Sequence, residues 1–271
     1  MMRLTAFAII LLCSWLAHAQ SEIKVFAEKE PKGFVIYASN EFYCPASLML
    51  NLELEGMVTV GDIPKVFVVP ARADKFRLIE IKATETATKI SYVSRFMFVM
   101  GDISLSKHDS TVLYDLPFAN GKRFMVHQGY NGQASHKNIK ALDFSMPVGT
   151  DVLAARDGVV VKVAEGNDQA CPEEQCAKYN NYVLLFHDDG SFSEYVHLSK
   201  GGALVDPGDK VKQGDLIARS GNTGWTSGPH LHFCAFMQKI DHRVTLATRF
   251  RTGNGQVSEL LAEKSWYDRK Y

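Results

Sequence analysis

Nine histidines occur in this 271-residue sequence, and four of them, with one aspartate, stand in segments that could form a metal-dependent active site. His230 and His232 flank Leu231 at the start of HLHFCAFM, an apolar stretch that indicates a strand. Because side chains alternate along a strand, both imidazoles project from one face, while Leu231 and Phe233 point to the other. One imidazole of such a pair can bind a metal while the other stands beside the metal-bound water. An HxH pair alone is weak evidence, because the same spacing describes any solvated strand face.

Two further polar residues, His136 and Asp143, lie upstream in the segment SHKNIKALDF. Asp143 stands between Leu142 and Phe144 at a strand-like position, where a buried carboxylate without a partner would be costly. Zinc would be such a partner. The alternative is an aspartate that caps the turn before Pro147. The residues alone leave both interpretations open.

Two more segments contribute candidates for substrate binding or oxyanion stabilisation. In SFSEYVHLSK, the alternation rule places Tyr195 and His197 on one face. The turn SGNTG contains Asn222, and its backbone is suited to approach an extended substrate, although a plain tight turn explains it equally well.

Taken in order, these motifs resemble those of the lysostaphin-like M23 metallopeptidases, also called LytM-domain peptidases. The resemblance covers roughly residues 124 to 245 and includes the segments PVGTDVLAARDGVVVKV and GDKVKQGDLIARSGNTG. It implies a lysostaphin-type antiparallel β peptidase domain with one zinc ion per chain. The zinc ligands that it implies are His136, Asp143 and His232, with His197 and His230 as a catalytic pair that does not bind the metal.

The chemistry of these residue types supports the same assignment. Two histidines and one carboxylate leave one tetrahedral position open, as in catalytic zinc sites. Zinc lowers the pKa of its water to about 7 and polarises a carbonyl. Because no HExxH motif supplies a glutamate, an imidazole with an ordinary pKa of about 6.5 must accept the proton. We expect His230 or His197 to be that base and His197 or Tyr195 to help stabilise the oxyanion.

The spacing of the first ligand pair departs from the pattern of this family. The commonest motif there is HxxxD, whereas six residues separate His136 from Asp143, so one tight turn cannot hold both. A longer loop would have to return them to one metal. His127, in VHQGYNG, is the competing first ligand.

Residues 1–19 have the features of a secretory signal peptide. Arg3 is basic, an apolar stretch runs from Leu4 to Leu16, and AHA precedes a cleavage point after Ala19. A membrane span needs about 20 apolar residues, so we expect cleavage and no remaining span. A retained anchor and a lipoprotein signal at Cys13 are the alternatives. The mature protein is expected in the periplasm or outside the cell, associated with the cell wall.

Alternating apolar and polar residues predict a mainly β protein. Residues 20–105 contain a series of such stretches and no histidine, which indicates an accessory β-sandwich of immunoglobulin-like type. It serves binding or spacing, or only packs on its neighbour. Residues 106–123 form a polar linker, and residues 124–252 form the M23-like zinc peptidase domain. Residues 253–271 form a tail with one helical candidate, SELLAEK.

Charge and cysteine content restrict the partners and the compartment. The 30 basic residues balance the 30 acidic ones, and loss of Arg3 leaves 29 − 30 = −1, so no nucleic-acid-binding surface is expected. An exported protein can form disulfides, and CPEEQC favours a bridge between Cys171 and Cys176 over two free thiols. The pairing of Cys44 and Cys234 stays open.

The combined features predict an exported zinc metalloendopeptidase that hydrolyses peptide bonds in peptidoglycan stem peptides or cross-bridges. Peptidoglycan peptides are its expected partners, and we expect a monomer. One alternative is a catalytically inactive LytM-type module that binds the wall or activates another hydrolase. Another is a zinc endopeptidase that cuts ordinary proteins. Zinc content, and digestion of a glycine-rich peptide beside casein, separate these functions.

Overall fold

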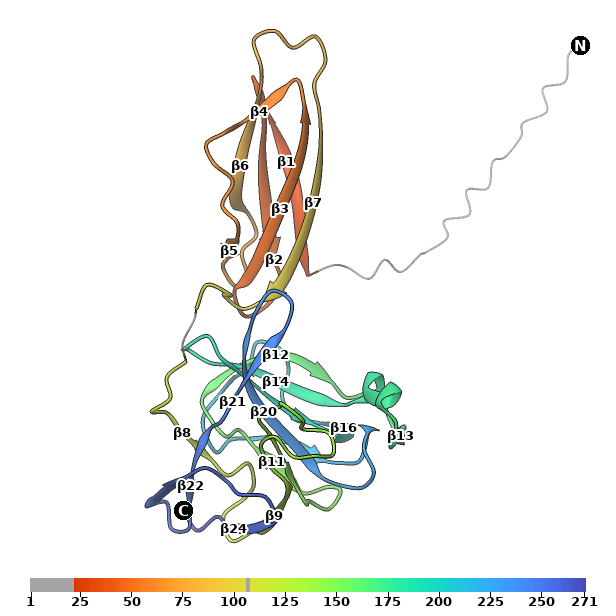
Figure 1. The fold of residues 1–271 in the computed structure, drawn as a ribbon, viewed down its shortest axis with the longest axis vertical. Coiled ribbons are helices and arrows are strands. Elements are labelled where there is room, and N and C mark those ends of the chain that lie inside the picture. The colour runs from red at the N-terminus through yellow and green to blue at the C-terminus, as the bar shows by residue number, and fades with distance from the viewer. Residues whose placement is uncertain (1–21, 106–107) are drawn as a thin grey trace, which may run out of the picture.

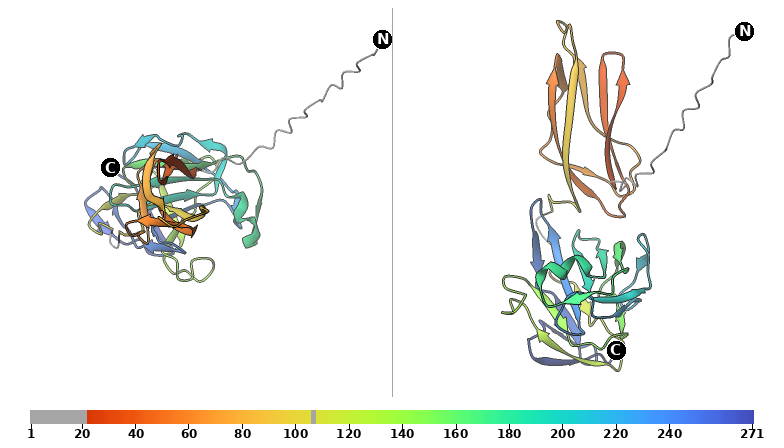
Figure 2. Two further views of the ribbon diagram at one scale, coloured as in Figure 1. Left: turned by 90° about the horizontal axis from the view of Figure 1, so that it is seen from above. Right: turned by 90° about the vertical axis from the view of Figure 1, so that its right-hand side faces the viewer.

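The computed structural model of this chain describes residues 22–105 and 108–271, and its regular secondary structure is almost entirely strands. The predicted signal peptide, residues 1–19, lies outside the described residues. Figure 1 shows the strands up to residue 100 in one lobe and those from residue 113 onward in a second lobe. In Figure 2 the two lobes are stacked end to end. Within the described ranges, no helix has the length and apolar character needed to cross a bilayer. The mainly β fold expected from the sequence is confirmed.

Two antiparallel sheets form the first lobe and enclose one hydrophobic core. One sheet has the order β1 (Ile23–Glu30), β2 (Gly33–Asn40), β6 (Phe76–Ala83) and β4 (Met57–Val60); the other has the order β5 (Phe67–Val69), β3 (Ala46–Glu55) and β7 (Ser91–Met100). In β3, Leu48 is fully buried, whereas Asn51 and Glu53 on the opposite face are exposed, as the alternation predicts. Both sheets contribute to the core, so the lobe is a β-sandwich, and its immunoglobulin-like topology stays a prediction.

A large sheet is the frame of the second lobe. Its spatial order is β17 (Lys210–Val211), β12 (Gly158–Ala164), β14 (Tyr182–Phe186), β15 (Phe192–Val196), β20 (Leu231–Gln238), β10 (Ala141–Phe144), β9 (Arg123–Gln128) and β24 (Ser265–Asp268), with β21 (Arg243–Leu246) also beside β20. Directly paired residues share a face of a sheet. Leu142, Phe233 and Tyr195 are paired in one row and are buried in the core on one side of this sheet. Asp143 and His232 therefore face the other side.

Smaller sheets close the core of the second lobe. They are β11 (Asp151–Leu153) with β18 (Leu216–Ser220) and β16 (Leu198–Ala203); β13 (Ala170–Cys171) with β19 (Gly224–Trp225); and β23 (Val257–Glu259) with β22 (Arg249–Thr252) and β8 (Leu113–Asp115). A short 3₁₀ helix, η1 (Glu174–Tyr179), follows β13. Figure 1 shows this helix and β13 together at one edge of the lobe.

Parts of the segments expected to be a linker and a tail contribute to the second lobe. Leu116 and Phe118 are fully buried in its core, and β8 pairs with β22. Strand β24 pairs with β9 and thereby extends the main sheet. The helix expected over SELLAEK is wrong, because residues 257–259 pair with β22 as a strand. So short a segment gains little from isolated helix formation, and cross-strand pairing prevails.

A third cluster of buried residues joins the two lobes. Cys44 from the first lobe packs with Phe192 and Phe236 of the second. Cys44 and Cys234, whose pairing the sequence left open, are separate buried thiols. Burial raises the pKa of the Cys44 thiol to about 12, so it is protonated at neutral pH.

Candidate metal centre

Three side chains converge on the face of the main sheet opposite the core. Asp143 on β10 is directly paired with His232 on β20, and Asp143 Oδ1 lies 2.9 Å from His232 Nδ1. His136, from the loop before β10, places its Nε2 3.3 Å from Asp143 Oδ2. Ligand atoms from the three residues all lie within 4.8 Å of one another. The structure thus brings together the three residues predicted as zinc ligands.

A turn in the loop before β10 closes the long gap between His136 and Asp143. The amide of Ile139 donates to the His136 carbonyl at 2.8 Å, and Asn138 has a left-handed conformation with φ of 61°. The His136 ring is oriented by its Nδ1, which lies 3.0 Å from the Gly129 carbonyl oxygen. The unusual spacing therefore still delivers His136 to the site.

The hydrogen bonding of His136 tests whether the site suits a cation. A carbonyl oxygen only accepts hydrogen bonds, so His136 Nδ1 carries the hydrogen and Nε2 of the neutral ring is an acceptor. This Nε2 is buried without a hydrogen-bond partner, although Asp143 Oδ2 lies 3.3 Å away. Two acceptors at that distance repel each other unless a cation lies between them. Two imidazoles and a carboxylate are ligands that zinc accepts, so these residues fit zinc.

The Asp143 carboxyl is held in its ionised form. Burial alone would raise its pKa, but the neighbouring histidines, among them the hydrogen-bonded His232, hold that pKa well below its ordinary value. Burial lowers the pKa of His232, and pairing with Asp143 outweighs this effect and raises it. Gln128 on β9 donates to Asp143 Oδ2 at 2.9 Å and accepts from the Ser135 amide at 3.1 Å. Gln128, which the sequence did not single out, therefore orients the carboxylate.

His197 and His230 lie beside the three ligands and present the same kind of nitrogen. His230 Nδ1 donates to the Gly228 carbonyl at 2.8 Å, and His197 Nδ1 donates to the Thr223 carbonyl at 2.7 Å. The two ring centroids are 4.5 Å apart, and His230 Nε2 is 3.7 Å from Asp143 Oδ1. In both neutral rings Nε2 is therefore the free acceptor.

Burial keeps these two histidines uncharged. Desolvation, with smaller contributions from His230 and His232, lowers the pKa of His197 to about 3. Desolvation also lowers the pKa of His230, and the charge of Asp143 offsets part of this effect. At neutral pH both rings are available to accept a proton.

Tyr195 lies away from the site, which corrects the expectation that it shares a face with His197. Tyr195 is paired with Phe233 on the core face, is fully buried, and accepts a hydrogen bond from the Ala155 amide at 2.7 Å. The alternation fails because β15 ends at Val196 and His197 has a φ of 67°. This left-handed residue turns its ring to the other side of the sheet. Tyr195 is a core residue and cannot serve as an oxyanion donor.

Asn222 supports the site indirectly and is not among the residues that line the groove. Its Oδ1 accepts a hydrogen bond from Thr226 Oγ1 at 2.9 Å. The same hydroxyl lies 3.3 Å from His230 Nδ1. Asn222 therefore acts on a residue that contacts His230, and direct contact with substrate is not indicated.

A disulfide between Cys171 and Cys176 lies next to this turn. Strand β13 pairs in parallel with β19, and the Thr226 amide donates to the Cys171 carbonyl at 3.0 Å. Trp225 Nε1 donates to the Pro172 carbonyl at 2.9 Å. The disulfide loop thus braces β19, which directly follows the carbonyl that orients one of the two histidines. No sequence pattern indicates this connection, because it depends on the pairing of β13 with β19.

His127 on β9, the competing first ligand, lies at the edge of the site. Its Nε2 is 3.8 Å from Asp143 Oδ2, and its Nδ1 is 3.3 Å from the Ser145 hydroxyl. Its ring centroid is 5.2 Å from that of His230. His127 is not one of the three residues whose ligand atoms converge, so the geometry favours His136 as the first ligand.

A groove of about 1120 Å³ contains all these histidines and Asp143. Trp225 lines it next to the disulfide loop. Three further lining residues are Lys162, Glu194 and Met100, of which Met100 belongs to the first lobe.

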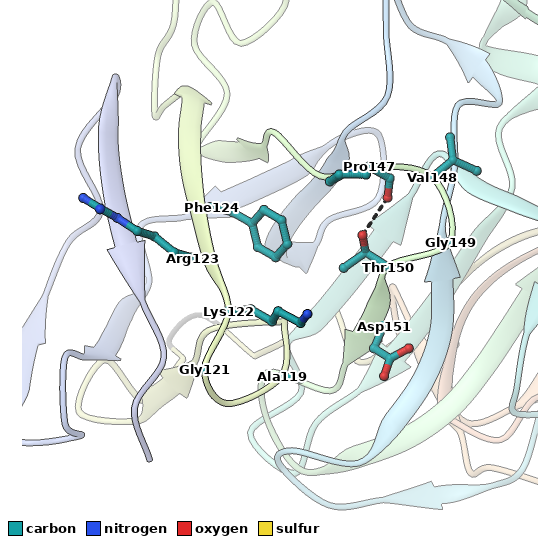
Figure 3. Close-up of a pocket in the computed structure, with 10 residues that line it drawn as sticks. All are labelled: Ala119, Gly121, Lys122, Arg123, Phe124, Pro147, Val148, Gly149, Thr150 and Asp151. Carbon is teal, nitrogen blue, oxygen red and sulfur yellow. Dashed lines mark hydrogen bonds between the residues drawn. The ribbon is translucent and has the colours of Figure 1, made fainter.

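A smaller cavity of about 520 Å³ lies between the start of β9 and the loop before β11 (Figure 3). In this loop, Thr150 Oγ1 donates to the Pro147 carbonyl at 2.7 Å. The carboxylate in the lining, Asp151, is paired with Arg219, and no lining residue is a histidine or cysteine. The groups suited to metal chemistry are therefore in the groove and not in this cavity.

Part of the chain is similar to known proteins. Residues 137–243 match the family model described as Peptidase family M23. The chain is 43% identical over 91 residues to the peptidoglycan DD-endopeptidase ShyA of Vibrio cholerae, a match that covers 34% of this chain and 18% of ShyA. It is 39% identical over 97 residues to the glycyl-glycine endopeptidase ALE-1 of Staphylococcus capitis, covering 35% of this chain and 24% of ALE-1. The chain thus spans less than a quarter of the length of either relative.

A solved structure of the catalytic domain of lysostaphin from Staphylococcus simulans is 27% identical to this chain, with a TM-score of 0.34. The similar region covers 51% of this chain and 95% of that domain. The family match begins one residue after His136 and includes Asp143, His197, His230 and His232. Residues 137–243 are therefore a domain of peptidase family M23, the metallopeptidase family that the sequence motifs resemble.

Proposed function

We propose that this chain is an exported zinc endopeptidase that hydrolyses peptide bonds in peptidoglycan stem peptides or cross-bridges. A cluster of two histidines and one aspartate that fits zinc supports the proposal, as do two further imidazoles with free acceptor nitrogens beside it. Relatives named for peptidoglycan and glycyl-glycine cleavage are similar to about a third of this chain. Peptidoglycan lies outside the cytoplasmic membrane, so the proposal places the mature protein in the periplasm or at the cell surface.

The side chains of the groove have distinct roles in this proposal. His136, Asp143 and His232 hold zinc, which supplies a Lewis acid and an acidified water when it is bound. His230 or His197 accepts the proton of the attacking water at Nε2, since the hydrogen of each neutral ring is already committed to a backbone carbonyl. The imidazolium formed in this step then donates its new proton to the leaving amine nitrogen.

The observation that carries the proposal is the buried, unpartnered Nε2 of His136 beside the Asp143 carboxylate. Metal analysis of the purified protein, combined with digestion of isolated peptidoglycan, tests it. We expect one zinc per chain and a release of soluble muropeptides that a chelator stops. Protein without zinc and without activity would contradict the proposal and support the inactive LytM-type module. Cleavage of casein but not of a glycine-rich peptide would support an endopeptidase for ordinary proteins.

A further inference from the structure

The groove face of the main sheet is organised in three cross-strand rows, because directly paired residues lie side by side on one face. The first row contains the metal site, the second contains charged side chains, and the third is aromatic. The rows are Asp143, His232, Val196 and Tyr182; Ala141, Cys234, Glu194, Leu184 and Lys162; and Phe236, Phe192 and Phe186.

Residues of the first lobe cover the third row. Phe192 and Phe236 are only 1% and 2% exposed, although they lie on the same face as the open metal site. Cys44 and Met100 belong to the apolar cluster that packs on them. The backbone at Gly101 is also close, since a Cβ atom there would lie 2.9 Å from Phe192 Cε2. The sheet face is therefore open at the metal row and closed at the aromatic row.

Hydrogen bonds hold this cover in place. Lys239, in the turn between β20 and β21, donates from Nζ to the carbonyls of Ile103 and Leu105 at 3.3 and 2.7 Å. Figure 1 shows the β20–β21 hairpin reaching toward the first lobe. On another side of the contact, a Cβ atom on Gly208 would lie 2.6 Å from the Tyr43 ring. The first lobe is thus hydrogen-bonded to the second through Lys239 and packs closely against it at Gly208.

The open floor of the groove ends at Met100. Met100 lines the same groove as the metal-binding residues. Along β20, two residues lead from His232 to Cys234 and four lead to Phe236, which corresponds to roughly 7 and 13 Å at 3.3 Å per residue. An extended peptide has the same rise, so about two to four of its residues fit between the metal row and the cover.

The second row carries a positive charge without a partner. Glu194 Oε2 lies 2.9 Å from Arg243 Nη1, so these two charges neutralise each other. Lys162 is exposed in the same groove, and no ion pair involves it within residues 22–105 and 108–271. An unpaired ammonium group recognises a carboxylate.

We propose that the first lobe determines which bonds are cut. It closes the groove at Met100, so that the enzyme cleaves bonds within about two to four residues of a peptide end whose free carboxylate meets Lys162. A peptide that continues past this point has to displace the cover or turn out of the groove. This inference rests on the proposed function and specifies the substrate class of the same site.

Full-length protein and synthetic peptides test the inference. The peptides share one D-alanyl or glycyl-glycine bond and carry two, four or eight residues beyond it, each as a free acid and as an amide. For wild type we expect kcat/KM to fall about tenfold between four and eight residues, and about tenfold on amidation of the short peptide, as for loss of one charge-assisted hydrogen bond. Met100→Ala should reduce the length effect, and Lys162→Met should remove the difference between acid and amide.

Met97→Ala, at a position 64% exposed on the same strand as Met100, is the matched control and should change neither ratio. Equal rates at all lengths, or a length effect that Met100→Ala leaves intact, would overturn the inference. If wild type cleaves none of the peptides, the proposed function fails, and peptide binding decides the inference separately. Tryptophan fluorescence can report this binding, because Trp225 lines the groove. Equal affinity for long and short peptides would then overturn the inference about the first lobe.

Discussion

The two lobes are built from the same kind of strand, yet they differ in what covers the faces of their sheets. In the first lobe each sheet buries one face and exposes the other, where Val58 and Met97 are 52% and 64% exposed. In the second lobe the main sheet buries one face in the core, while its other face is partly covered and partly an open polar groove. A chemical site therefore arises where a sheet face is enclosed at its sides but not filled by apolar side chains.

Histidine content follows the same division. Residues 22–105 contain no histidine, and every histidine near the groove belongs to the second lobe. Substitutions that abolish chemistry should therefore lie in the second lobe, and substitutions that alter substrate choice should lie where the lobes meet.

Removal of a metal ligand should have the largest effect. His232→Ala leaves only His136 and Asp143 for the metal, so we expect loss of zinc and a fall in hydrolysis on the order of 10⁴-fold, about 5 kcal/mol of barrier. Zinc content and muropeptide release measure the two effects. Asn51→Ala, on the exposed face of the first lobe, should leave both unchanged. Zinc bound by His232→Ala as by wild type would contradict the ligand assignment.

Removal of a non-ligand histidine should separate catalysis from metal binding. His230→Ala should keep zinc and lose roughly 10²- to 10⁴-fold in kcat, because the groove loses one of its two neutral acceptors. His127→Ala is the comparison within the same groove, and its effect should be smaller, since the His127 side chain is 34% exposed against 10% for His230 and is less firmly held. Measurement of kcat beside zinc content checks both. A larger loss in His127→Ala would reverse the roles assigned to these residues.

Loss of the disulfide should have an intermediate effect. In Cys171→Ser combined with Cys176→Ser, β19 loses its brace, so the carbonyl that orients His197 shifts and kcat falls roughly tenfold while zinc is retained. The free energy of unfolding should fall by about 2 kcal/mol, as expected for so short a loop. A reductant should slow the wild type and leave the double variant unaffected. Unchanged kcat in the double variant would mean that the loop does not position this histidine.

Strand alternation explains how much of the site the sequence could predict. The HLH pair and the aspartate of ALDF are polar residues flanked by apolar ones. The structure places Asp143 and His232 on one face of the sheet and their apolar neighbours Leu142 and Phe233 on the other, as this pattern requires. The sequence could not show that Tyr195 and His197 lie on different faces of the sheet, because one left-handed residue breaks the alternation. His136 depends on a turn rather than on a strand period, and Gln128 acts through a hydrogen bond that no spacing indicates.

The limits of fold prediction have a similar physical origin. A period of two identifies a strand but not its partner, which is set by packing between distant segments. Residues 113–118 and 265–268 therefore look like parts of a linker and a tail in the sequence, although they contribute to the core and the main sheet. The sequence also could not show that Phe192 and Phe236 are covered, because the covering residues belong to the other lobe.

The last prediction concerns the stability of the second lobe rather than the rate of hydrolysis, and it involves His187. It is fully buried, with Nδ1 2.6 Å from the Asp157 carbonyl oxygen and Nε2 2.9 Å from Ser193 Oγ. Burial, aided by the charge of Arg156, lowers its pKa from 6.5 to about 4. Above pH 6.5 the ring is neutral in both the folded and the unfolded chain. Between pH 6.5 and 4 only the unfolded chain binds the proton, so the free energy of unfolding should fall by roughly 3 kcal/mol as pH falls.

His187→Gln keeps a donor and an acceptor at this position but does not titrate, so its free energy of unfolding should depend less on pH over the same interval. Urea unfolding of the metal-free proteins between pH 4 and 7 measures the difference. Tryptophan fluorescence restricts the measurement to the second lobe, because Trp225 and Trp266 both lie there. The variant should be as active as wild type at neutral pH, since both side chains are then uncharged. Equal slopes for the two proteins would mean that His187 binds its proton as readily in the folded as in the unfolded state. His187 would then not contribute to the acid sensitivity of the second lobe.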